Sequence, residues 1–184
     1  MAVLPAGALA GFGRFRAGFI FGGHVCALLP GLPGDYLRGA YYGMTLRRLG
    51  ANSRISFGTF FSTADVVIGE GVYIGAYCVI GRARIGRNAQ ISSQVQILSG
   101  NRQHVRDEQG NILGAEAGDF SETTIGAYAW IGAAAVVMAD IGERTTVGAG
   151  AIVTKPLPAG VTAVGNPARV IRTLLDPPSV SVPS

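Results

Sequence analysis

Aliphatic residues recur at every sixth position over two long stretches of the chain, except for a five-residue step into Ile85 and a shorter step into Ile141. The first stretch runs from Ile68 to Ile97 and the second from Ile125 to Val153, and a small residue, most often Gly, usually follows each aliphatic. A spacing of six matches neither the 3.6-residue repeat of a helix nor the two-residue repeat of an ordinary strand. A short fixed repeat is typical of a parallel β-helix, in which each hexad forms one flat face and three hexads close one coil. We therefore expect the aliphatic side chains to point into a narrow core, while the small residues relieve crowding at the corners.

The repeat divides the chain into three parts. We expect an N-terminal apolar and helical segment over residues 1–51, a β-helix domain over residues 52–160, and a C-terminal segment with a tail over residues 161–184. In the first part, apolar residues at spacings of three and four predict a helix that begins at Asp35 and that Gly50 can end.

A polar, Gly-rich insertion interrupts the repeat over residues 98–124. Loops of this length are uncommon in compact proteins and are usually either functional or disordered. Because the repeat resumes in register at Ile125, the insertion is predicted to project from one edge of an uninterrupted stack.

The first 34 residues are apolar and Gly-rich, and they contain Arg14 and Arg16. The apolar run is short for a bilayer span and is interrupted by Gly, His and Pro, and it lacks the pattern of a signal peptide. One interpretation is that this segment packs on the β-helix or on a neighbouring subunit. The other is peripheral membrane contact through its apolar and Arg side chains. We expect a cytoplasmic protein, with the second interpretation placing it at the inner face of the membrane.

Composition and charge narrow the classes of partner. Charged residues are 14% of the 184 and the net charge is +4, which favours a small phosphorylated ligand or an anionic surface. The Lys and Arg residues are spread along the chain without interleaved aromatics, so no nucleic-acid partner is expected. Cys26 and Cys78 have no metal-ligand spacing, and Cys78 is expected to be a small buried hydrophobe rather than part of a disulfide.

The second stretch of repeats and its ending resemble a known family. The elements VGAGAIVTK (Val147–Lys155) and GNPARVIR (Gly165–Arg172) are similar to the C-terminal half of the hexapeptide-repeat acyltransferases, which include the maltose and galactoside O-acetyltransferases. The resemblance covers about residues 52–172, and residues 35–62 also resemble the lead-in of capsule and exopolysaccharide O-acetyltransferases. It implies an all-β, left-handed parallel β-helix with an N-terminal helical segment and a long catalytic loop. It also implies a homotrimer that binds acetyl-CoA as a co-substrate between neighbouring subunits, with no permanently bound cofactor.

The resemblance and the chemistry of coenzyme A together predict which residues bind it. Small residues allow close backbone approach, so the pantetheine arm is expected along Ala133, Ala149 and Gly150, with Trp130 near the thioester. The phosphates of coenzyme A require cations, for which an Arg offers a planar fork and a Lys a point charge. The matching positions at the end of the repeat are Thr154, Lys155, Arg169 and Arg172. The alternative interpretations are corner packing for the small residues and solvated surface charge for the cations.

His104, in the polar insertion, is the candidate catalytic residue. Transfer of an acyl group to a hydroxyl requires removal of the hydroxyl proton, and imidazole titrates near neutrality. The resemblance implies the same role, because family members carry their catalytic histidine on this loop. The other histidine, His24, is expected to be packed in the N-terminal segment. Asn101 and Gln103 are candidates for binding the acceptor. Candidates for a carboxylate that orients His104 are Asp107, Glu108, Glu116 and Asp119.

The predicted activity is acyl-CoA-dependent O-acylation, most simply O-acetylation, of a sugar or saccharide hydroxyl by direct transfer, in polysaccharide biosynthesis. The sequence departs from the sugar acetyltransferases in two places. Residues 80–85 read IGRARI, without the acidic pair that contacts the acceptor in those enzymes, and the step before Ile141 is shortened to MADI. Two alternatives stay open: an N-acyltransferase acting on an amino sugar, amino acid or antibiotic amine, and a non-catalytic binding scaffold. A catalytic zinc site on this fold would need three imidazoles, so no metal is expected.

Overall fold

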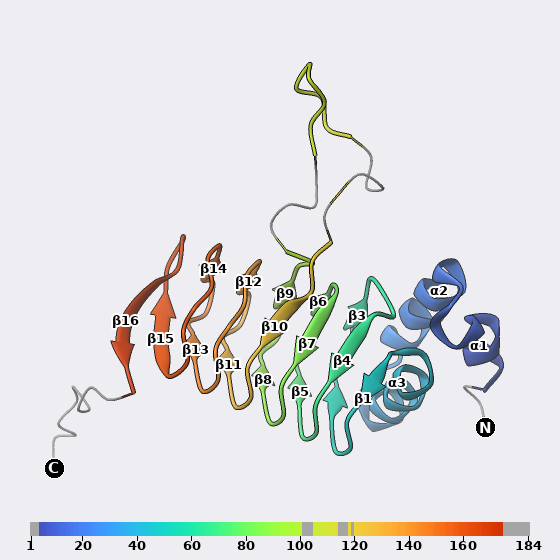
Figure 1. Cartoon of the computed structure of the whole chain (residues 1–184). Helices are drawn as coiled ribbons and strands as arrows, with labels where there is room; N and C mark the ends of the chain where they lie inside the picture. Colours follow the sequence, from blue (N-terminus) through green and yellow to red (C-terminus); the bar gives the residue numbers. More distant parts are fainter. Residues whose placement is uncertain (1–3, 101–104, 114–117, 119, 175–184) are drawn as a thin grey trace, which may run out of the picture.

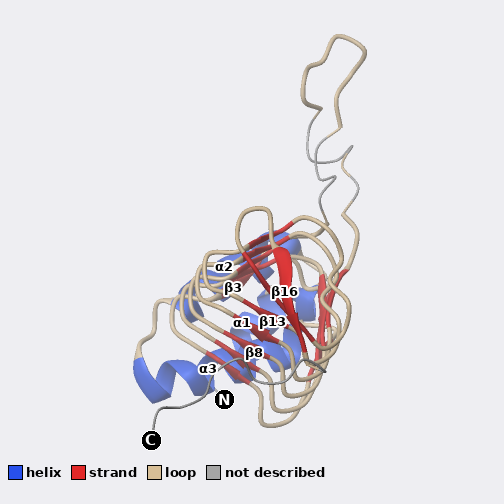
Figure 2. Cartoon of the chain, turned by 90° about the vertical axis from the view of Figure 1, so that its left-hand side faces the viewer, coloured by secondary structure: helices blue, strands red, loops and turns tan. Residues whose placement is uncertain are grey.

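Short strands joined by tight turns stack in register and form the body of the molecule, and three helices and a 3-10 turn cover one end of it (Figure 1). The computed structural model describes residues 4–100, 105–113, 118 and 120–174. Viewed along the stack, successive coils are nearly superposed, and the insertion leaves from one edge (Figure 2). The predicted class, an all-β parallel β-helix with an N-terminal helical part, is confirmed.

Three sheets form the walls of the β-helix. Sheet A contains β1 (Arg48–Leu49), β4 (Val66–Ile68), β7 (Ala83–Ile85) and β10 (Thr123–Ile125). Sheet B contains β2 (Arg54–Ile55), β5 (Tyr73–Ile74), β8 (Gln90–Ile91), β11 (Trp130–Ile131), β13 (Thr146–Val147) and β15 (Val161–Val164). Sheet C contains β3 (Phe60–Phe61), β6 (Val79–Ile80), β9 (Gln96–Ile97), β12 (Val136–Val137) and β14 (Ile152–Val153). A last strand, β16 (Arg169–Thr173), runs antiparallel to β15 and ends sheet B.

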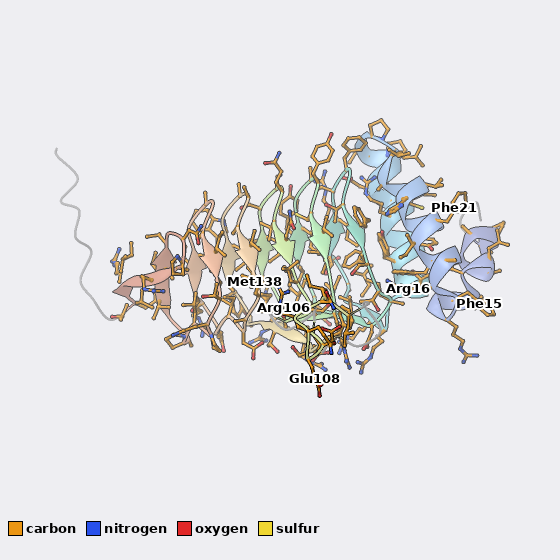
Figure 3. The ribbon with its side chains drawn as sticks, turned by 90° about the horizontal axis from the view of Figure 1, so that it is seen from above. Phe15, Arg16, Phe21, Arg106, Glu108 and Met138 are labelled. Carbon is orange, nitrogen blue, oxygen red and sulfur yellow. The ribbon has the colours of Figure 1, made fainter. Side chains whose placement is uncertain are left out.

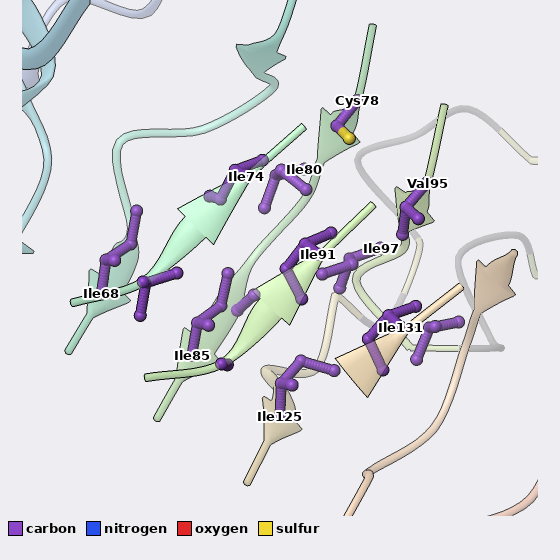
Figure 4. Close-up of a cluster of buried hydrophobic side chains, with 14 of the residues drawn as sticks. Ile68, Ile74, Cys78, Ile80, Ile85, Ile91, Val95, Ile97, Ile125 and Ile131 are labelled. Carbon is purple, nitrogen blue, oxygen red and sulfur yellow. The ribbon is translucent and has the colours of Figure 1, made fainter. Parts of the chain in front are cut away.

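The aliphatic residue of each hexad points into the core. Ile68, Ile85 and Ile125 are register partners on neighbouring strands of sheet A, and all three are buried (Figure 4). Burial of one such side chain stabilises the fold by about 1.5–3 kcal/mol. The five-residue step into Ile85 leaves the register intact. After the shortened MADI step, Ile141 still bridges Ile125 and thereby continues sheet A.

Small residues follow the aliphatics because the backbone of the next coil lies directly against them. A Cβ atom added to Gly75 would lie 2.5 Å from the backbone nitrogen of Ser93, and one added to Gly132 would lie 2.5 Å from that of Ala149. Both distances are far below van der Waals contact, so neighbouring coils would have to separate. The expected relief of crowding is therefore confirmed.

The helical cap is formed by α1 (Leu4–Leu9), the 3-10 turn η1 (Gly11–Gly13), α2 (Arg16–Ala27) and α3 (Gly31–Thr45). It packs on the first coil through buried aromatic residues: the rings of Tyr42 and Phe61 meet edge to face, with their centroids 4.6 Å apart. Arg38 is fully buried, and its guanidinium donates hydrogen bonds to the carbonyls of Cys26, Leu29 and Ile55. These bonds join α2, α3 and β2. Among the described helices, none reaches the length and hydropathy that a bilayer span requires.

Two details of the cap differ from expectation. The third helix begins at Gly31 rather than Asp35, directly after Pro30. It ends at Thr45 rather than near Gly50, because Arg47 donates its backbone N–H to Ala64 and β1 pairs with β4. His24 is exposed rather than packed, because it lies off the buried face of α2. Its one ring contact among the described residues is with Phe60, edge to face, with the centroids 4.6 Å apart.

Both cysteines are free thiols and buried. Cys78 is a small core residue, as expected, and burial raises the pKa of its thiol.

We expect the Gly75→Ala substitution to lower the free energy of unfolding by about 1–3 kcal/mol, the usual penalty for overpacking a rigid interior. Gly39→Ala is the matched control, because a Cβ atom there meets nothing within 4 Å and the residue lies in α3. It should leave stability unchanged or raise it by up to about 1 kcal/mol. Chemical denaturation of both variants measures the difference, and equal stabilities would contradict the proposed crowding between coils.

Candidate functional site

Two of the nominated binding residues share the outward face of sheet B. Trp130 is the register partner of Thr146, Thr146 is that of Thr162, and Thr162 is paired with Arg172. Trp130 and Arg172 are thus separated by three strand spacings, or roughly 14 Å. The Trp130 side chain is 55% exposed, and its indole N–H donates to the hydroxyl of Ser92 at 3.3 Å. This row therefore offers an aromatic surface at one end and a cation at the other.

The nominated small residues form the corner that joins sheet B to sheet C. Ala133, Ala149 and Gly150 are exposed there, and Gly150 donates its N–H to the carbonyl of Ala133 on the preceding coil at 2.8 Å. The corner requires a left-handed backbone, with φ 67° at Gly150 and 57° at the matching Ala134. Glycine adopts this conformation without the cost of about 1–2 kcal/mol that other residues incur. The result is a surface of methyl groups and bare backbone that an extended ligand can approach closely.

Arg169 lies at the end of the same corner. The turn between β15 and β16 is attached to sheet C, because Ala168 donates its N–H to the carbonyl of Ile152 at 2.8 Å. The exposed Arg169 follows directly, and its guanidinium donates to the carbonyl of Ala168 at 3.1 Å. The cation therefore lies just beyond the coil that carries Ala149 and Gly150.

Thr154 and Lys155 lie apart from this group. They follow β14 at the corner between sheets C and A, where Thr154 is half-buried and Lys155 is exposed. The width of sheet C thus separates them from Ala149 and Gly150. A cavity of about 560 Å³ near Gly160 contains none of the nominated residues. Within one chain, six of the eight residues predicted to bind coenzyme A therefore lie on one face and corner, and the other two, Thr154 and Lys155, lie on another corner.

His104, Asn101 and Gln103 lie outside the described residues, as do Glu116 and Asp119. The described tip of the insertion, residues 105–113, is a hairpin closed by a bridge between Arg106 and Ile112, and it projects from the stack (Figures 1 and 2). The Asp107 carboxylate accepts hydrogen bonds from the side chain and backbone of Asn111 and from the backbone of Gln109. These hydrogen bonds, of which the one from the Asn111 side chain has the largest effect, hold the pKa of the Asp107 carboxyl below its usual value. Asp107 is therefore committed to the hairpin turn, whereas Glu108 is exposed at the tip.

Sequence reasoning missed the residue that joins the two limbs of the insertion at its base. The buried hydroxyl of Thr123 donates to the carbonyl of Leu98 at 2.7 Å and accepts from the N–H of Gly100 at 3.3 Å. The sequence does contain a sign of this role, because Thr123 is a polar residue at a position that points into the core. Its register partner on the neighbouring strand is the buried Ala83. This hydroxyl anchors the limb that leads to His104 to the limb that returns.

The arginines of the IGRARI segment hold the returning limb against sheet A. Arg82 donates to the carbonyl of Phe120 at 3.2 Å, and Arg84 pairs with Glu122 at 3.0 Å. Arg82 also pairs with Asp65 at 2.7 Å. Each exposed pair contributes about 0–1 kcal/mol, so their effect is to orient the limb more than to stabilise the fold. The absence of an acidic pair in this segment thus coincides with a structural use of the same positions.

The chain is similar in sequence to hexapeptide-repeat transferases. Residues 65–99 match the family model described as bacterial transferase hexapeptide (six repeats). The chain is 47% identical over 55 residues to a galactoside O-acetyltransferase of Escherichia coli K12, which covers 29% of this chain and 27% of that protein. Matches to this and three other curated relatives cover between 24% and 61% of their lengths.

The solved structures agree with this comparison. A hexapeptide-repeat-containing acetyltransferase from Vibrio cholerae superposes with a TM-score of 0.73 at 20% identity, over 94% of each chain. A galactoside acetyltransferase in complex with coenzyme A gives a TM-score of 0.72 at 23% identity, over 88% of this chain and 83% of that chain. The resemblance to hexapeptide-repeat acetyltransferases that was read from the repeats and the ending is therefore confirmed, and the fold is shared.

We expect Thr123→Val to destabilise the base of the insertion, because the donor to Leu98 and the acceptor for Gly100 are both lost. A buried unsatisfied partner costs about 1–3 kcal/mol. Hydrogen exchange should show faster exchange of the Gly100 amide, and calorimetry should show a lower unfolding temperature. Thr123→Ser keeps the hydroxyl and should retain slow exchange at Gly100. Equal exchange in the Val and Ser variants would contradict the assigned role.

Proposed function

We propose that this protein transfers an acyl group, most simply acetyl, from acyl-CoA to a hydroxyl of a sugar or saccharide. The observation that carries the proposal is the alignment of Trp130, Ala133, Ala149, Gly150 and Arg172 along one face and one corner of the stack. An aromatic ring, a narrow apolar edge and a cation follow one another in the order that the thioester, pantetheine and phosphates of coenzyme A require. The relatives and the coenzyme A complex of a similar fold support the same assignment.

The position of Thr154 and Lys155 supports a homotrimer. These two residues lie on a different corner from Ala149 and Gly150, with sheet C between the two corners. Three elongated prisms around a threefold axis form a closed ring with three identical grooves. In our proposal each groove combines the sheet B face of one copy with the corner after β14 of its neighbour. Coenzyme A then bridges two copies, and neither copy alone forms the whole site.

The proposed chemistry is direct transfer with His104 as general base. Imidazole takes the proton of the acceptor hydroxyl as its oxygen attacks the thioester carbonyl. When the tetrahedral intermediate collapses, the carbon–sulfur bond breaks, and the imidazolium returns the proton to the leaving thiolate. A covalent acyl-cysteine step is not part of this scheme. Both cysteines are buried, and burial raises the pKa of each thiol.

The nature of the acceptor rests on the resemblance and on the polar insertion. Asn101 and Gln103 are proposed to hydrogen-bond a saccharide acceptor, in a role in polysaccharide biosynthesis. An amine acceptor would require the same base, so the two acceptor classes are separated by a screen of matched sugars and amino sugars with acetyl-CoA. Faster thiol release with the amino sugars than with the matched sugars would show that the acceptor is an amine and that the activity is N-acylation.

We expect His104→Ala to lower kcat/KM by about 100-fold or more, the usual contribution of a general base. Thiol release from acetyl-CoA in the presence of an active acceptor measures the loss. His24→Ala removes the other histidine, which lies in α2, and should keep wild-type turnover. Near wild-type turnover of His104→Ala would end the assignment of this residue as the base.

We expect charge reversal at Lys155, Arg169 or Arg172 to raise the Kd for coenzyme A by about tenfold or more, because a charge-assisted hydrogen bond to phosphate is lost. Titration calorimetry measures the change, and pantetheine, which lacks the phosphates, should bind all variants equally. Arg48→Glu is the matched control, since this exposed arginine lies on β1 in the first coil. Unchanged affinity for coenzyme A in the three variants would refute the proposed phosphate site.

A further inference from the structure

The second helix of the cap buries apolar side chains on one face and exposes others on the opposite face. Its inward face contains buried Phe19 and Cys26. Its outward face carries Phe21 and Val25, and Leu28 follows as the C-cap residue; these side chains are 70%, 46% and 74% exposed. The exposed His24 lies beside them. Residues spaced by four and then three form one stripe along a helix. A surface helix of a soluble protein normally presents a polar outer face, so this stripe indicates a partner of apolar character.

The stripe is part of a wider apolar surface. Phe15 and Phe21 lie on the outer side of the cap, away from the strands (Figure 3). Other exposed apolar residues of the same cap, each at least half exposed, are Leu4, Leu9, Phe12 and Leu32. Apolar surface gathered in this way on one end of a molecule marks an interaction site.

The charge of the first part of the cap, residues 4–34, is of one sign. Between residues 4 and 34 the chain contains Arg14 and Arg16 and no acidic residue. Neither arginine forms an ion pair with any residue that the structure describes, although both are exposed. The first acidic residue, Asp35, is already paired with Arg38 and Arg54. The surface therefore carries unpaired cations among exposed aromatic rings.

A hollow between the cap and the first coil brings these groups together. Arg14 and Arg16 line a cavity of about 390 Å³ with Phe12 and Arg47. Asp65 also lines it, but its carboxylate is paired with Arg47 and with Arg82. The hollow thus has room and free guanidinium groups for an anionic headgroup beside an apolar rim.

We propose that the helical cap docks on an anionic phospholipid surface. Exposed Phe12 of η1 and Phe21 of α2, with Leu28 at the end of α2, enter the boundary between headgroups and acyl chains. Arg14 and Arg16 contact lipid phosphates. Charge complementarity favours this occupant over a second copy of the cap. Two caps facing each other would bring four guanidinium groups together without a free carboxylate between residues 4 and 34 to pair with them. This docking is independent of the acyl transfer proposed above.

Flotation of the full-length protein with vesicles tests the proposal. We expect binding to vesicles that contain phosphatidylglycerol, at least tenfold weaker binding to pure phosphatidylcholine, and a decrease as salt is raised, since salt screens exposed charges. The double variants Arg14→Glu/Arg16→Glu and Phe15→Ser/Phe21→Ser should each lower partitioning by tenfold or more. Circular dichroism and the affinity for coenzyme A should remain unchanged in both, because all four residues are exposed and lie at the opposite end of the stack from β16 (Figure 1).

The controls make each outcome decisive. Arg48→Glu reverses an exposed charge on β1, and Ile112→Ser removes an exposed apolar side chain from the hairpin of the insertion. Both should bind vesicles as the wild type does. Equal binding of wild type and the two double variants would overturn the proposal. A fall in molecular mass of Phe15→Ser/Phe21→Ser in sedimentation, together with no vesicle binding by the wild type, would overturn it in favour of an interface between copies.

Discussion

The structure depends on the close approach of backbones in neighbouring coils. Gly126 lies so close to the next coil that an added Cβ atom would meet the backbone nitrogen of Glu143 at 2.4 Å, and Gly142 and Ala159 repeat the contact at 2.3 Å. Inter-strand hydrogen bonds set this spacing, and only a small residue fits it. The same constraint keeps the coils in register over their whole length. Every row of side chains on the surface is a consequence of that register.

Register converts positions far apart in sequence into one continuous surface. Gln90, Trp130 and Thr146 are separated by the insertion or by a full coil, yet they lie side by side on sheet B. The B–C corner repeats in the same way, through the hydrogen bond from Gly150 to Ala133. A long, thin ligand suits such a surface, because the binding groups recur at a fixed interval along a straight line. The proposed site for coenzyme A therefore uses a property of the repeat itself rather than a special local structure.

The insertion is the part of the molecule that the repeat does not organise. Its base is held instead by specific polar contacts: the hydroxyl of Thr123 joins the two limbs, and Arg82 and Arg84 attach the returning limb to sheet A. Asp107 stabilises the hairpin near its tip. A rigid stack thus carries an insertion whose described limbs are attached at a few points, which is compatible with the proposed catalytic role of His104.

The sequence by itself determined the fold and the core, because a period of six reports directly which side chains point inward. It also identified the chain's relatives, because the VGAGAIVTK and GNPARVIR elements are specific. Only the tertiary structure decided which nominated residues share a surface. It separated Thr154 and Lys155 from Trp130, and it committed Asp107 to a turn. It also revealed Thr123 and the outward apolar stripe of α2. These features depend on contacts between coils and between helices and coils, and a period along one chain carries no information about which corner or face a neighbour will meet.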